Sequence, residues 1–319
     1  MADLDFEAPF AEGLKRLTEL RAYRGDPGKE REAAVLKAQL DKDRREVYAN
    51  LTSWQRTLVA RHPNRPYTLD YVGALLTDFM EVKGDRRFAD DPAIVCGFGM
   101  FDGRAVCVIG HQKGRDTKAK IHRNFGMPKP EGYRKAIRIM RMAEKFARPI
   151  ITFVDTPGAY PGLDAEERGQ AEAIAFNLRE MAKLTVPVIV TVVGEGGSGG
   201  ALAIAVGNRV NMLENSVYSV ITPEGCASIL WRDPARAPEA AKAMKVAAPD
   251  MKALGLIDDI IEEPPGGAHS DHDATFEAVR AVLTRQLGEL TGKSVKELLN
   301  ERYDKFRAMG RIGQDLVEG

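Results

Sequence analysis

The stretch Val186-Pro-Val-Ile-Val-Thr-Val-Val193, followed directly by Gly194-Glu-Gly-Gly-Ser-Gly-Gly200 and Ala201-Leu-Ala-Ile-Ala-Val206, indicates the fold class of this chain. Its first part is β-branched and apolar throughout, which is typical of a strand buried on both faces. Five glycines follow within seven residues, and the small apolar residues after them suit a helix. A strand, a glycine turn and a helix N-terminus together expose backbone N–H groups at the positive end of a helix dipole. Such a turn can hold a phosphate or the oxygen of a reacting carbonyl.

The glycine run contains a dinucleotide-binding pattern. Gly194, Gly196 and Gly199 have the spacing G-x-G-x-x-G, and Glu214 lies about twenty residues beyond Gly194, where a ribose-binding acid is expected. A dinucleotide-binding domain, however, usually carries this motif early, in a regular series of alternating strands and helices. Here the motif follows several predicted strands. A dinucleotide-dependent oxidoreductase is one open alternative.

The same run also contains a nucleophile-elbow pattern. Residues 196–200 spell G-x-S-x-G around Ser198, with His269 and His272 downstream as candidate bases. A serine nucleophile needs such a base and an acid that orients it. Both histidines belong to a polar segment, residues 266–272, which we expect to be a flexible loop. A serine hydrolase is the second open alternative, and oxyanion binding by backbone N–H groups is the third.

Charge and composition limit the classes of function. Lys plus Arg and Asp plus Glu number 46 each, so the formal net charge is zero, which argues against general nucleic-acid binding. The 319 residues, 44% of them hydrophobic, suffice for one large domain with appendages or for two domains. A P-loop is absent, because Leu287 stands where the motif before Gly292-Lys-Ser294 requires glycine.

Cysteine usage and the absence of targeting signals suggest the compartment. Cys96, Cys107 and Cys226 are scattered and form no C-x-x-C pair, so we expect neither a disulfide framework nor a metal site in this chain. The first residues lack the basic and apolar regions of a signal peptide, and no apolar run reaches membrane-spanning length. These observations predict a cytoplasmic protein without a membrane segment.

The pattern along the chain predicts an α/β protein with helices at each end. A charged helical arm is expected at residues 1–62, the main domain at residues 63–290, and a C-terminal helical tail at residues 291–319. Strands are predicted over residues 93–101, 104–110, 149–154, 186–193, 209–213, 217–220 and 257–261. Helices are predicted over residues 29–61, 69–82, 131–147, 166–184, 235–254 with a break near Pro249, 275–290 and 295–309.

Two further stretches carry candidate site residues. The turn Asp155-Thr-Pro-Gly-Ala-Tyr-Pro-Gly162 follows another buried strand, and two such turns on adjacent strands would lie side by side, which favours a shared site. Residues 111–124 form a predicted basic loop with a single acid. Its cations are Lys113, Arg115, Lys118, Lys120 and Arg123. A solvated loop and an anion site for a phosphorylated ligand both remain open.

Seven motifs, in order along the chain, resemble the carboxyltransferase alpha subunit of bacterial acetyl-coenzyme A carboxylase. They are Gly110-His-Gln-Lys-Gly-Arg115, Arg123-Asn-Phe-Gly-Met-Pro128, Pro130-Glu-Gly-Tyr-Arg-Lys-Ala136, Phe153-Val-Asp-Thr-Pro-Gly-Ala-Tyr-Pro-Gly162, Glu166-Glu-Arg-Gly-Gln170, Gly194-Glu-Gly-Gly-Ser-Gly-Gly-Ala201 and Tyr218-Ser-Val-Ile-Thr-Pro-Glu-Gly-Cys-Ala-Ser-Ile-Leu-Trp231. The match covers about residues 61–269, and the helical N-terminus also fits. Seven ordered motifs are far more specific than either glycine pattern.

The resemblance implies a crotonase-like fold, a superhelix of repeated β-β-α turns. It implies transfer of a carboxyl group from carboxybiotin on a carrier protein to acetyl-coenzyme A, which gives malonyl-coenzyme A for fatty acid synthesis. It also implies partners, namely a beta subunit in an α2β2 assembly, the biotin carboxyl carrier protein and biotin carboxylase. Zinc is expected on the beta subunit only, and no cofactor is expected to stay bound to this chain.

The resemblance also assigns residues to the site. Gly199 and Gly200 would be the catalytic N–H donors to the biotin-side oxyanion, and the thioester oxyanion hole would come from the beta subunit. Ser198 would be a small residue that lets the backbone turn. The expected substrate-binding residues are Gly158, Ala159, Tyr160, Gly196, Gly197, Lys113 and Arg115. The last two are inferred from their charge to bind coenzyme A or carrier-side anions.

Overall fold

The centre of the fold is a mixed sheet. The computed structural model describes residues 4–23 and 25–310, and within these the strands lie in the order β1-β2-β3-β4-β5-β6-β8, with β7 paired to the end of β5. Their bounds are β1 (Thr77–Glu81), β2 (Ile94–Phe101), β3 (Arg104–His111), β4 (Ile150–Thr156), β5 (Val188–Gly197), β6 (Arg209–Leu213), β7 (Val217–Ser219) and β8 (Asp259–Ile261). β1 to β3 are antiparallel neighbours, whereas β3, β4, β5, β6 and β8 run parallel.

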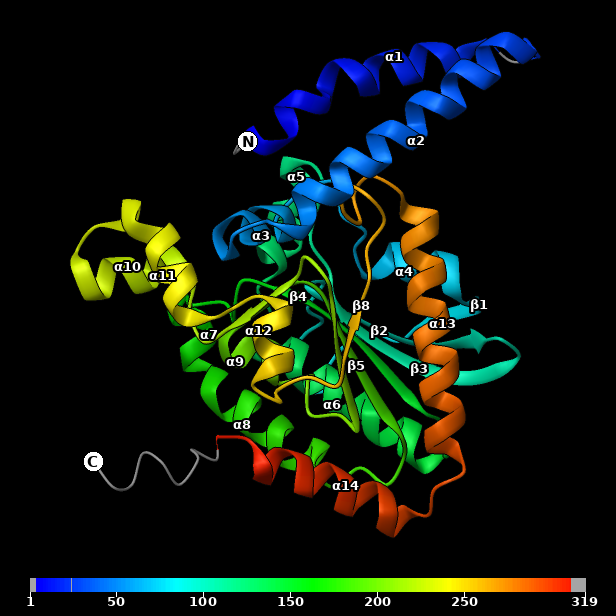
Figure 1. Cartoon of the computed structure of the whole chain (residues 1–319). Coiled ribbons are helices and arrows are strands. Elements are labelled where there is room, and N and C mark those ends of the chain that lie inside the picture. Colours follow the sequence, from blue (N-terminus) through cyan, green and yellow to red (C-terminus); the bar gives the residue numbers. More distant parts are fainter. Residues whose placement is uncertain (1–3, 24, 311–319) are drawn as a thin grey trace, which may run out of the picture.

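Helices cover both faces of this sheet (Figure 1), as parallel strands require. One face packs against α6, α8, α9 and α12, and the other packs against α4 and α13. The helices are α1 (Ala11–Ala22), α2 (Pro27–Ala49), α3 (Ser53–Ala60), α4 (Thr68–Leu75), α5 (Thr117–His122), α6 (Pro130–Lys145), α7 (Leu163–Glu167), α8 (Gln170–Met181), α9 (Ser198–Leu202), α10 (Pro223–Trp231), α11 (Ala237–Met244), α12 (Ala248–Ala253), α13 (His272–Thr291) and α14 (Val295–Ala308), with short 3-10 turns at Asp5–Phe10, Asn124–Gly126 and Pro234–Arg236. Within the part of the chain that the structure describes, we find no helix that could span a membrane.

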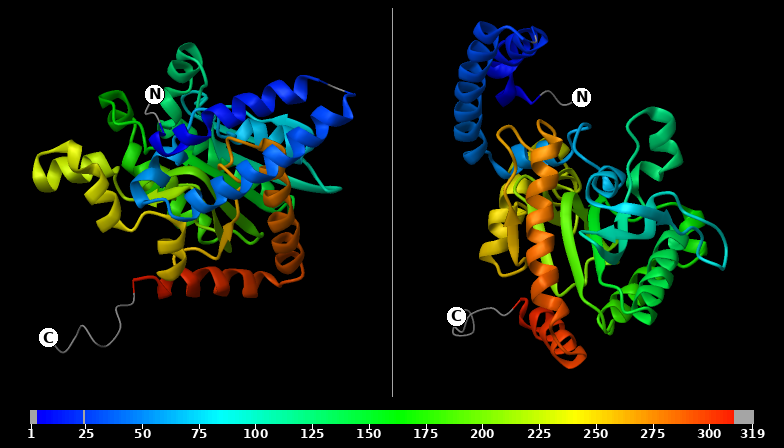
Figure 2. Two further views of the ribbon diagram at one scale, coloured as in Figure 1. Left: turned by 45° about the horizontal axis from the view of Figure 1, so that its top comes forward. Right: turned by 90° about the vertical axis from the view of Figure 1, so that its right-hand side faces the viewer.

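The N-terminal arm is a helical hairpin. α1 and α2 lie side by side over a small core of their own and project from the body (Figures 1 and 2). The prediction of a single helix over residues 29–61 is wrong, because this segment forms two helices, α2 and α3. Thr52 accepts the N–H of Gln55, whose side chain accepts the N–H of Thr52 in return, and this capping box starts a new helix at Ser53. The domain boundary at residue 62 stays a prediction. α3 contacts the body as well as the arm, because Ala60 packs in one cluster with Val217 and Val246.

The predicted helix over residues 69–82 is also wrong in its second half. α4 ends at Leu75, and Thr77–Glu81 forms the edge strand β1, which pairs with β2. Gly97 and Gly99 of β2 make this possible. A Cβ on Gly97 would overlap the Met80 carbonyl oxygen and the Phe79 ring, so the two strands can approach only because that side chain is missing. Tertiary pairing therefore overrides the helical pattern.

Three more segments differ from the prediction. The predicted helix at 166–184 is broken between α7 and α8 by Gly169, which has φ 82°. The basic loop at 111–124 contains the short helix α5, capped by Asp116. α10 is absent from the predicted elements, although Thr222-Pro-Glu224 is a helix-start sequence and Thr222 caps the helix through the N–H of Gly225.

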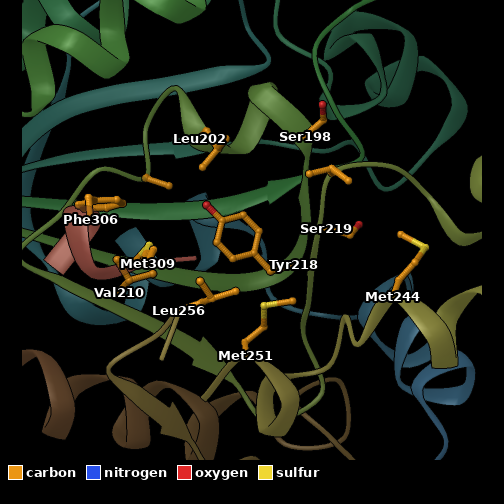
Figure 3. Close-up of a pocket in the computed structure, with 12 residues that line it drawn as sticks. Ser198, Leu202, Val210, Tyr218, Ser219, Met244, Met251, Leu256, Phe306 and Met309 are labelled. Carbon is orange, nitrogen blue, oxygen red and sulfur yellow. The ribbon is translucent and has the colours of Figure 1, made fainter. Parts of the chain in front are cut away.

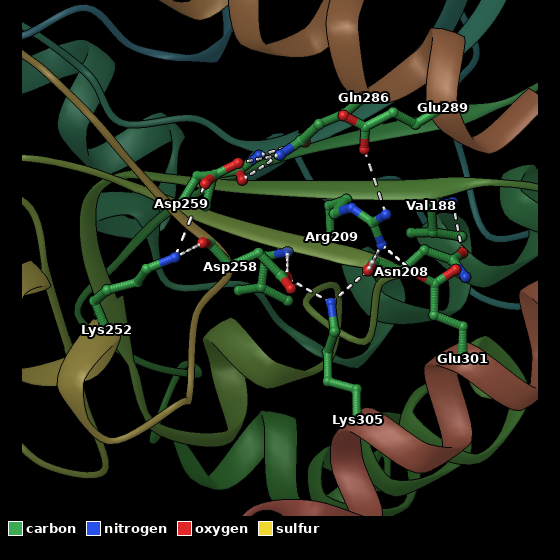
Figure 4. Close-up of polar contacts among 12 residues, drawn as sticks. Val188, Asn208, Arg209, Lys252, Asp258, Asp259, Gln286, Glu289, Glu301 and Lys305 are labelled. Carbon is green, nitrogen blue, oxygen red and sulfur yellow. Dashed lines mark hydrogen bonds and ion pairs between the residues drawn. The ribbon is translucent and has the colours of Figure 1, made fainter.

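Polar contacts attach the C-terminal helices to the strands (Figure 4). Asn208 accepts the N–H of Val188 at 3.1 Å and donates to the carbonyl of Leu298 at 2.8 Å, and Lys305 forms an ion pair with Asp258. The buried Arg302 donates to four oxygens, those of Met181, Leu184, Val186 and the Asn208 side chain. α14 thus packs on the main body, and the predicted boundary at residue 291 stays untested. Residues 311–319 of the predicted tail lie outside the described residues.

Candidate active site

The glycine run is partly strand rather than turn. β5 continues to Gly197, so Gly194, Gly196 and Gly197 belong to it, and the predicted turn begins only at Ser198. A Cβ on Gly194 would overlap the Asp155 carboxylate, and one on Gly197 would overlap the carbonyl of Pro157. A Cβ on Gly196 would lie 2.6 Å from the Tyr218 ring. These glycines let the neighbouring chain segments approach the backbone of β5 closely.

The N-terminus of α9 lies against the loop that follows β4. A Cβ on Gly200 would be 2.5 Å from the backbone nitrogen of Ala159 and 2.6 Å from the carbonyl carbon of Gly158, too close for any side chain. A Cβ on Gly199, in contrast, would meet Ile174 at an ordinary 3.4 Å. The first N–H groups of a helix have no acceptor within it, and α9 has no side-chain cap among the described residues. The N–H groups of Gly199 and Gly200 are therefore available to a ligand.

The loop 155–162 folds as predicted beside the glycine run, because β4 and β5 are adjacent parallel strands. The hydroxyl of Thr156 accepts the N–H of Gly158 at 3.1 Å and donates to its carbonyl at 2.7 Å, which closes the turn. Gly158 has φ 152°, a conformation that favours glycine. The N–H of Tyr160 donates to Pro128, and the ammonium of Lys129 lies 4.7 Å from the centre of the Tyr160 ring.

His111, which belongs to the first of the seven motifs, contacts both halves of the site. It ends β3 and is fully buried. Its Nε2 lies 3.2 Å from the carbonyl oxygen of Gly200, and its Nδ1 accepts the N–H of Asp155 at 3.4 Å. Burial, followed by the nearby Lys113 charge, lowers the pKa of His111 to about 3. The ring is therefore neutral at physiological pH.

Lys113 and Arg115 are engaged with the protein itself. The Lys113 ammonium lies 2.7 Å from Asp155 Oδ1 and 2.9 Å from Glu195 Oε2. Arg115 pairs with Asp70 at 2.5 Å, donates to the carbonyl of Pro63 at 2.9 Å and lies over the ring of Tyr67. Their predicted contacts with coenzyme A or a carrier protein stay untested, but both side chains also have a structural task that the sequence did not reveal.

The serine-nucleophile alternative is not supported by the geometry. Ser198 has φ 54°, a strained backbone that a nucleophile elbow would share. None of the described histidines forms a hydrogen bond with it. His269, expected in a flexible loop, is instead buried and stacked on His62 at 3.8 Å between ring centres. His272 begins α13 and contacts the carbonyl of Asn64.

The dinucleotide alternative also lacks its partner residue. Glu214 follows β6 and accepts the backbone N–H of Glu263 at 3.2 Å, so its side chain is used within the fold. The glycine run itself lies late in a sheet that begins with antiparallel strands.

Comparison with known proteins decides the family. Residues 3–310 match the family model described as acetyl co-enzyme A carboxylase carboxyltransferase-like. A protein of Syntrophotalea carbinolica, named acetyl-coenzyme A carboxylase carboxyl transferase subunit alpha, is 62% identical over 311 residues, which cover 97% of this chain and 98% of that protein. The chain belongs to this family. A protein of the same name from Pseudomonas aeruginosa is 56% identical over 96% of this chain and 98% of its own length.

Solved structures support the same fold. Transcarboxylase 12S, with methylmalonyl-coenzyme A bound, has a TM-score of 0.58 and 21% identity, over 72% of this chain and 42% of that chain. A chain of the Pseudomonas malonate decarboxylase hetero-tetramer has a TM-score of 0.56 and 20% identity, over 72% of this chain and 89% of its own length. The predicted crotonase-like α/β fold is confirmed. As a member of its family, the chain acts in carboxyl transfer during acetyl-coenzyme A carboxylation and works with other subunits, as the motifs predicted.

An apolar cavity of about 430 Å³ opens beside α9 in this family member (Figure 3). Ser198 and Leu202 of α9 lie at one side of it, and Phe306 and Met309 reach it from the C-terminal end of α14. Tyr218, whose ring lies against Gly196, forms another wall. The cavity thus joins the glycine run to the C-terminal helix, a relationship that periodicity does not show. Among the described residues, no three His, Cys, Asp or Glu side chains gather as metal ligands would.

Proposed function

We propose that this chain forms the biotin-side half of a carboxyltransferase site, in which a carboxyl group passes from carboxybiotin on a carrier protein to acetyl-coenzyme A and gives malonyl-coenzyme A. The partner that completes the site is a beta subunit in an α2β2 assembly, and the biotin carboxyl carrier protein and biotin carboxylase supply the carboxybiotin. The observation that carries the proposal is the N-terminus of α9, where the N–H groups of Gly199 and Gly200 lie beside the 155–162 loop.

The reaction needs hydrogen-bond donors at two oxygens. Loss of the carboxyl group leaves negative charge on the biotin ureido oxygen, and removal of a methyl proton leaves an enolate oxygen on the thioester. Pre-positioned N–H groups stabilise such charges without reorganisation, which raises kcat. Gly199 and Gly200 donate to the ureido oxygen, and the dipole of α9 adds to their effect. The beta subunit donates to the thioester oxygen.

The remaining predicted residues shape the biotin pocket. Gly158, Ala159 and Tyr160 form its wall, because Gly158 and Ala159 already lie within van der Waals reach of Gly200. Gly196 and Gly197 let the Tyr218 ring and the Pro157 carbonyl pack directly on the backbone of β5 at the base of the pocket. The position of Gly197 against Pro157 supports this role, since any side chain there would push the two loops apart.

Anion binding falls to the basic segment around α5. Lys113 and Arg115 are paired within the protein, so we assign contact with coenzyme A phosphates or carrier carboxylates to their neighbours Lys118 and Lys120. Both lie on α5, which projects from the body in the right-hand view of Figure 2. Exchange of both lysines for glutamate should raise the KM for the phosphorylated or carrier-bound substrate and leave kcat largely unchanged.

The experiment that tests the proposal measures malonyl-coenzyme A formed from carboxybiotin and acetyl-coenzyme A. The first assay contains the chain alone, and the second contains the chain with its purified beta subunit. The third contains the same beta subunit with chain that has been denatured by heat. We expect turnover only in the second assay. Activity of the chain alone would contradict a site shared between two subunits. A lack of activity in an assembled and correctly folded pair would contradict the proposed reaction.

A further inference from the structure

The ion pairs of Lys113 link the ends of β4 and β5, where the two loops of the site begin. Its ammonium lies 2.7 Å from Asp155 at the end of β4 and 2.9 Å from Glu195 in β5. The Lys113 side chain is 14% exposed, that of Asp155 is 3% exposed and that of Glu195 is 11% exposed, so the three charges are largely removed from water. At such burial, an unbalanced charge is costly.

The carboxylate of Asp155 also takes the place of a backbone acceptor in the pairing of β4 with β5. Between Val154 and Thr156 the pairing of β4 with β5 shifts register. Here the Asp155 side chain accepts the backbone N–H of Glu195 at 3.0 Å and occupies the space beside Gly194, where a Cβ would overlap it. Asp155 therefore sets how the 155–162 loop leaves β4 and how the glycine run leaves β5.

Two cations pair with the three carboxylates of this cluster, Asp155, Glu195 and Glu224. Besides Lys113, Arg61 donates to Glu195 at 2.7 Å and to Glu224 of α10 at 2.5 Å. Although burial alone would raise it, Lys113 and Arg61 hold the pKa of Glu195 at about 2. Burial opposes the charged form of Lys113, but Asp155 and Glu195 raise its pKa above the ordinary value. Glu195 and Lys113 are therefore both ionised at neutral pH.

We propose that Lys113 is a positioning residue of the carboxyltransferase reaction, which holds the 155–162 loop against the N-terminus of α9 by pairing with both Asp155 and Glu195. It does so without contacting substrate. In its absence, the two carboxylates repel each other across the junction, and the contact between Ala159 and Gly200 that aligns the N–H donors is loosened. The negative charges also oppose the negative charge that develops at those donors. This inference rests on the proposed function for its activity readout.

The test is a double-mutant cycle of Lys113→Gln and Asp155→Asn, assayed with the beta subunit. The glutamine keeps most of the side-chain length without the charge. The asparagine keeps an oxygen that can accept the Glu195 N–H, and the remaining Glu195 still has Arg61. The double variant therefore has the same net charge in the cluster as the wild type. Lys183→Gln is the matched control, since Lys183 is 62% exposed and pairs only at the surface with Glu180.

The assay uses assembled enzyme at a temperature well below its melting temperature. We expect Lys113→Gln to lower kcat on the order of 10²-fold, with little change in the KM for acetyl-coenzyme A. Adding Asp155→Asn should recover about tenfold or more of this loss. A mainly structural lysine would lower the melting temperature but leave kcat per assembled enzyme unchanged. A lysine that binds substrate anions would raise KM, and the second substitution would not restore it. Either of these two results would overturn the proposal.

Two further outcomes are informative. If Lys113→Gln alone fails to fold, the double variant decides, because the proposal predicts that it assembles and retains kcat within about tenfold of the wild type. An assembled but inactive double variant would overturn it. If the wild-type pair forms no malonyl-coenzyme A, the proposed function fails. The cluster is then tested by urea unfolding, in which Asp155→Asn must restore stability lost in Lys113→Gln.

Discussion

The Nε2 atom of His111 lies 3.2 Å from the carbonyl oxygen of Gly200, while Nδ1 of the same ring accepts the N–H of Asp155. Because Nδ1 accepts, the ring proton belongs on Nε2, which donates to Gly200. One neutral imidazole thus links β3, the loop after β4 and the first turn of α9. It complements Lys113, which stands two residues later and ties the same loops by charge.

The buried state of His111 makes stability depend on pH. Its pKa is lowered to about 3 in the folded chain, whereas it is about 6.5 when unfolded. This contribution to stability is complete above pH 6.5 and is lost as the pH falls toward 3, because the unfolded chain then binds the proton more readily. When the pH is lowered from 7 to 5, the free energy of unfolding measured in urea should fall by about 2 kcal/mol more in the wild type than in His111→Gln.

That comparison isolates His111 from other groups. His62, with a pKa lowered to about 4 mainly by burial, destabilises the fold in the same pH range, but it is present in both proteins. Glu195, with a pKa of about 2, stays ionised at both pH values. Equal losses of stability in the two proteins would show that His111 is not held neutral by the fold.

Gly199 and Gly200 should respond differently to alanine. At Gly200 the new Cβ meets Ala159 and Gly158 at 2.5–2.6 Å, so Gly200→Ala should cost about 1–3 kcal/mol of stability and separate the two loops. At Gly199 the Cβ meets only Ile174 at 3.4 Å, and Gly199→Ala should leave the melting temperature nearly unchanged. Thermal unfolding of both variants checks this. Equal destabilisation would mean that the close approach at Gly200 is not what demands glycine there.

Ser198 should be dispensable as a side chain. Its φ of 54° is a strained conformation that glycine adopts freely. Ser198→Gly should therefore raise stability by up to about 1 kcal/mol, and kcat should change less than about threefold, since no nucleophile is lost. A fall in kcat of about 10⁴-fold, with folding intact, would restore the serine hydrolase alternative.

The buried pair of Arg65 and Glu263 should dominate the stability of the core near β5. The two side chains are 1% and 0% exposed and form two hydrogen bonds, at 2.7 and 2.9 Å, and Arg65 also donates to the carbonyl of Val193. Arg65→Met should cost about 3–5 kcal/mol, because it leaves a buried carboxylate without its partner. Adding Glu263→Gln should recover part of this loss in urea unfolding. No recovery would mean that the uncompensated charge is not the cause.

The sequence predicted most strands of the body and the neighbourhood of the two glycine-containing loops, for physical reasons. The residues at 188–193 are all β-branched and mostly apolar on both faces, so their pattern indicates a buried strand without further information. Adjacent parallel strands then place their C-terminal loops together, and residues 155–162 do lie beside Gly200. The seven motifs supplied the family.

What the sequence could not supply depends on contacts between distant segments. β1 forms because Gly97 leaves room for Phe79 and Met80. The local pattern of hydrophobic residues cannot show that space, because it depends on a residue of another strand. In the sequence, Lys113 is one of several cations in a basic loop. Only the fold shows that Asp155 and Glu195, which are distant in sequence, lie beside it. The signal that could have drawn attention to His111 and Lys113 was their place in the first of the seven motifs.

The backbone N–H groups at the start of α9 are central to the proposed reaction, because they stabilise the biotin-side oxyanion. The most direct measurement replaces Gly199 with glycolic acid, which exchanges its N–H for an ester oxygen and adds no side chain, and compares kcat of the assembled enzyme with that of the wild type. Loss of one oxyanion donor should lower kcat roughly 10²- to 10³-fold with the melting temperature nearly unchanged. Unchanged kcat in the ester variant would contradict the role given to Gly199.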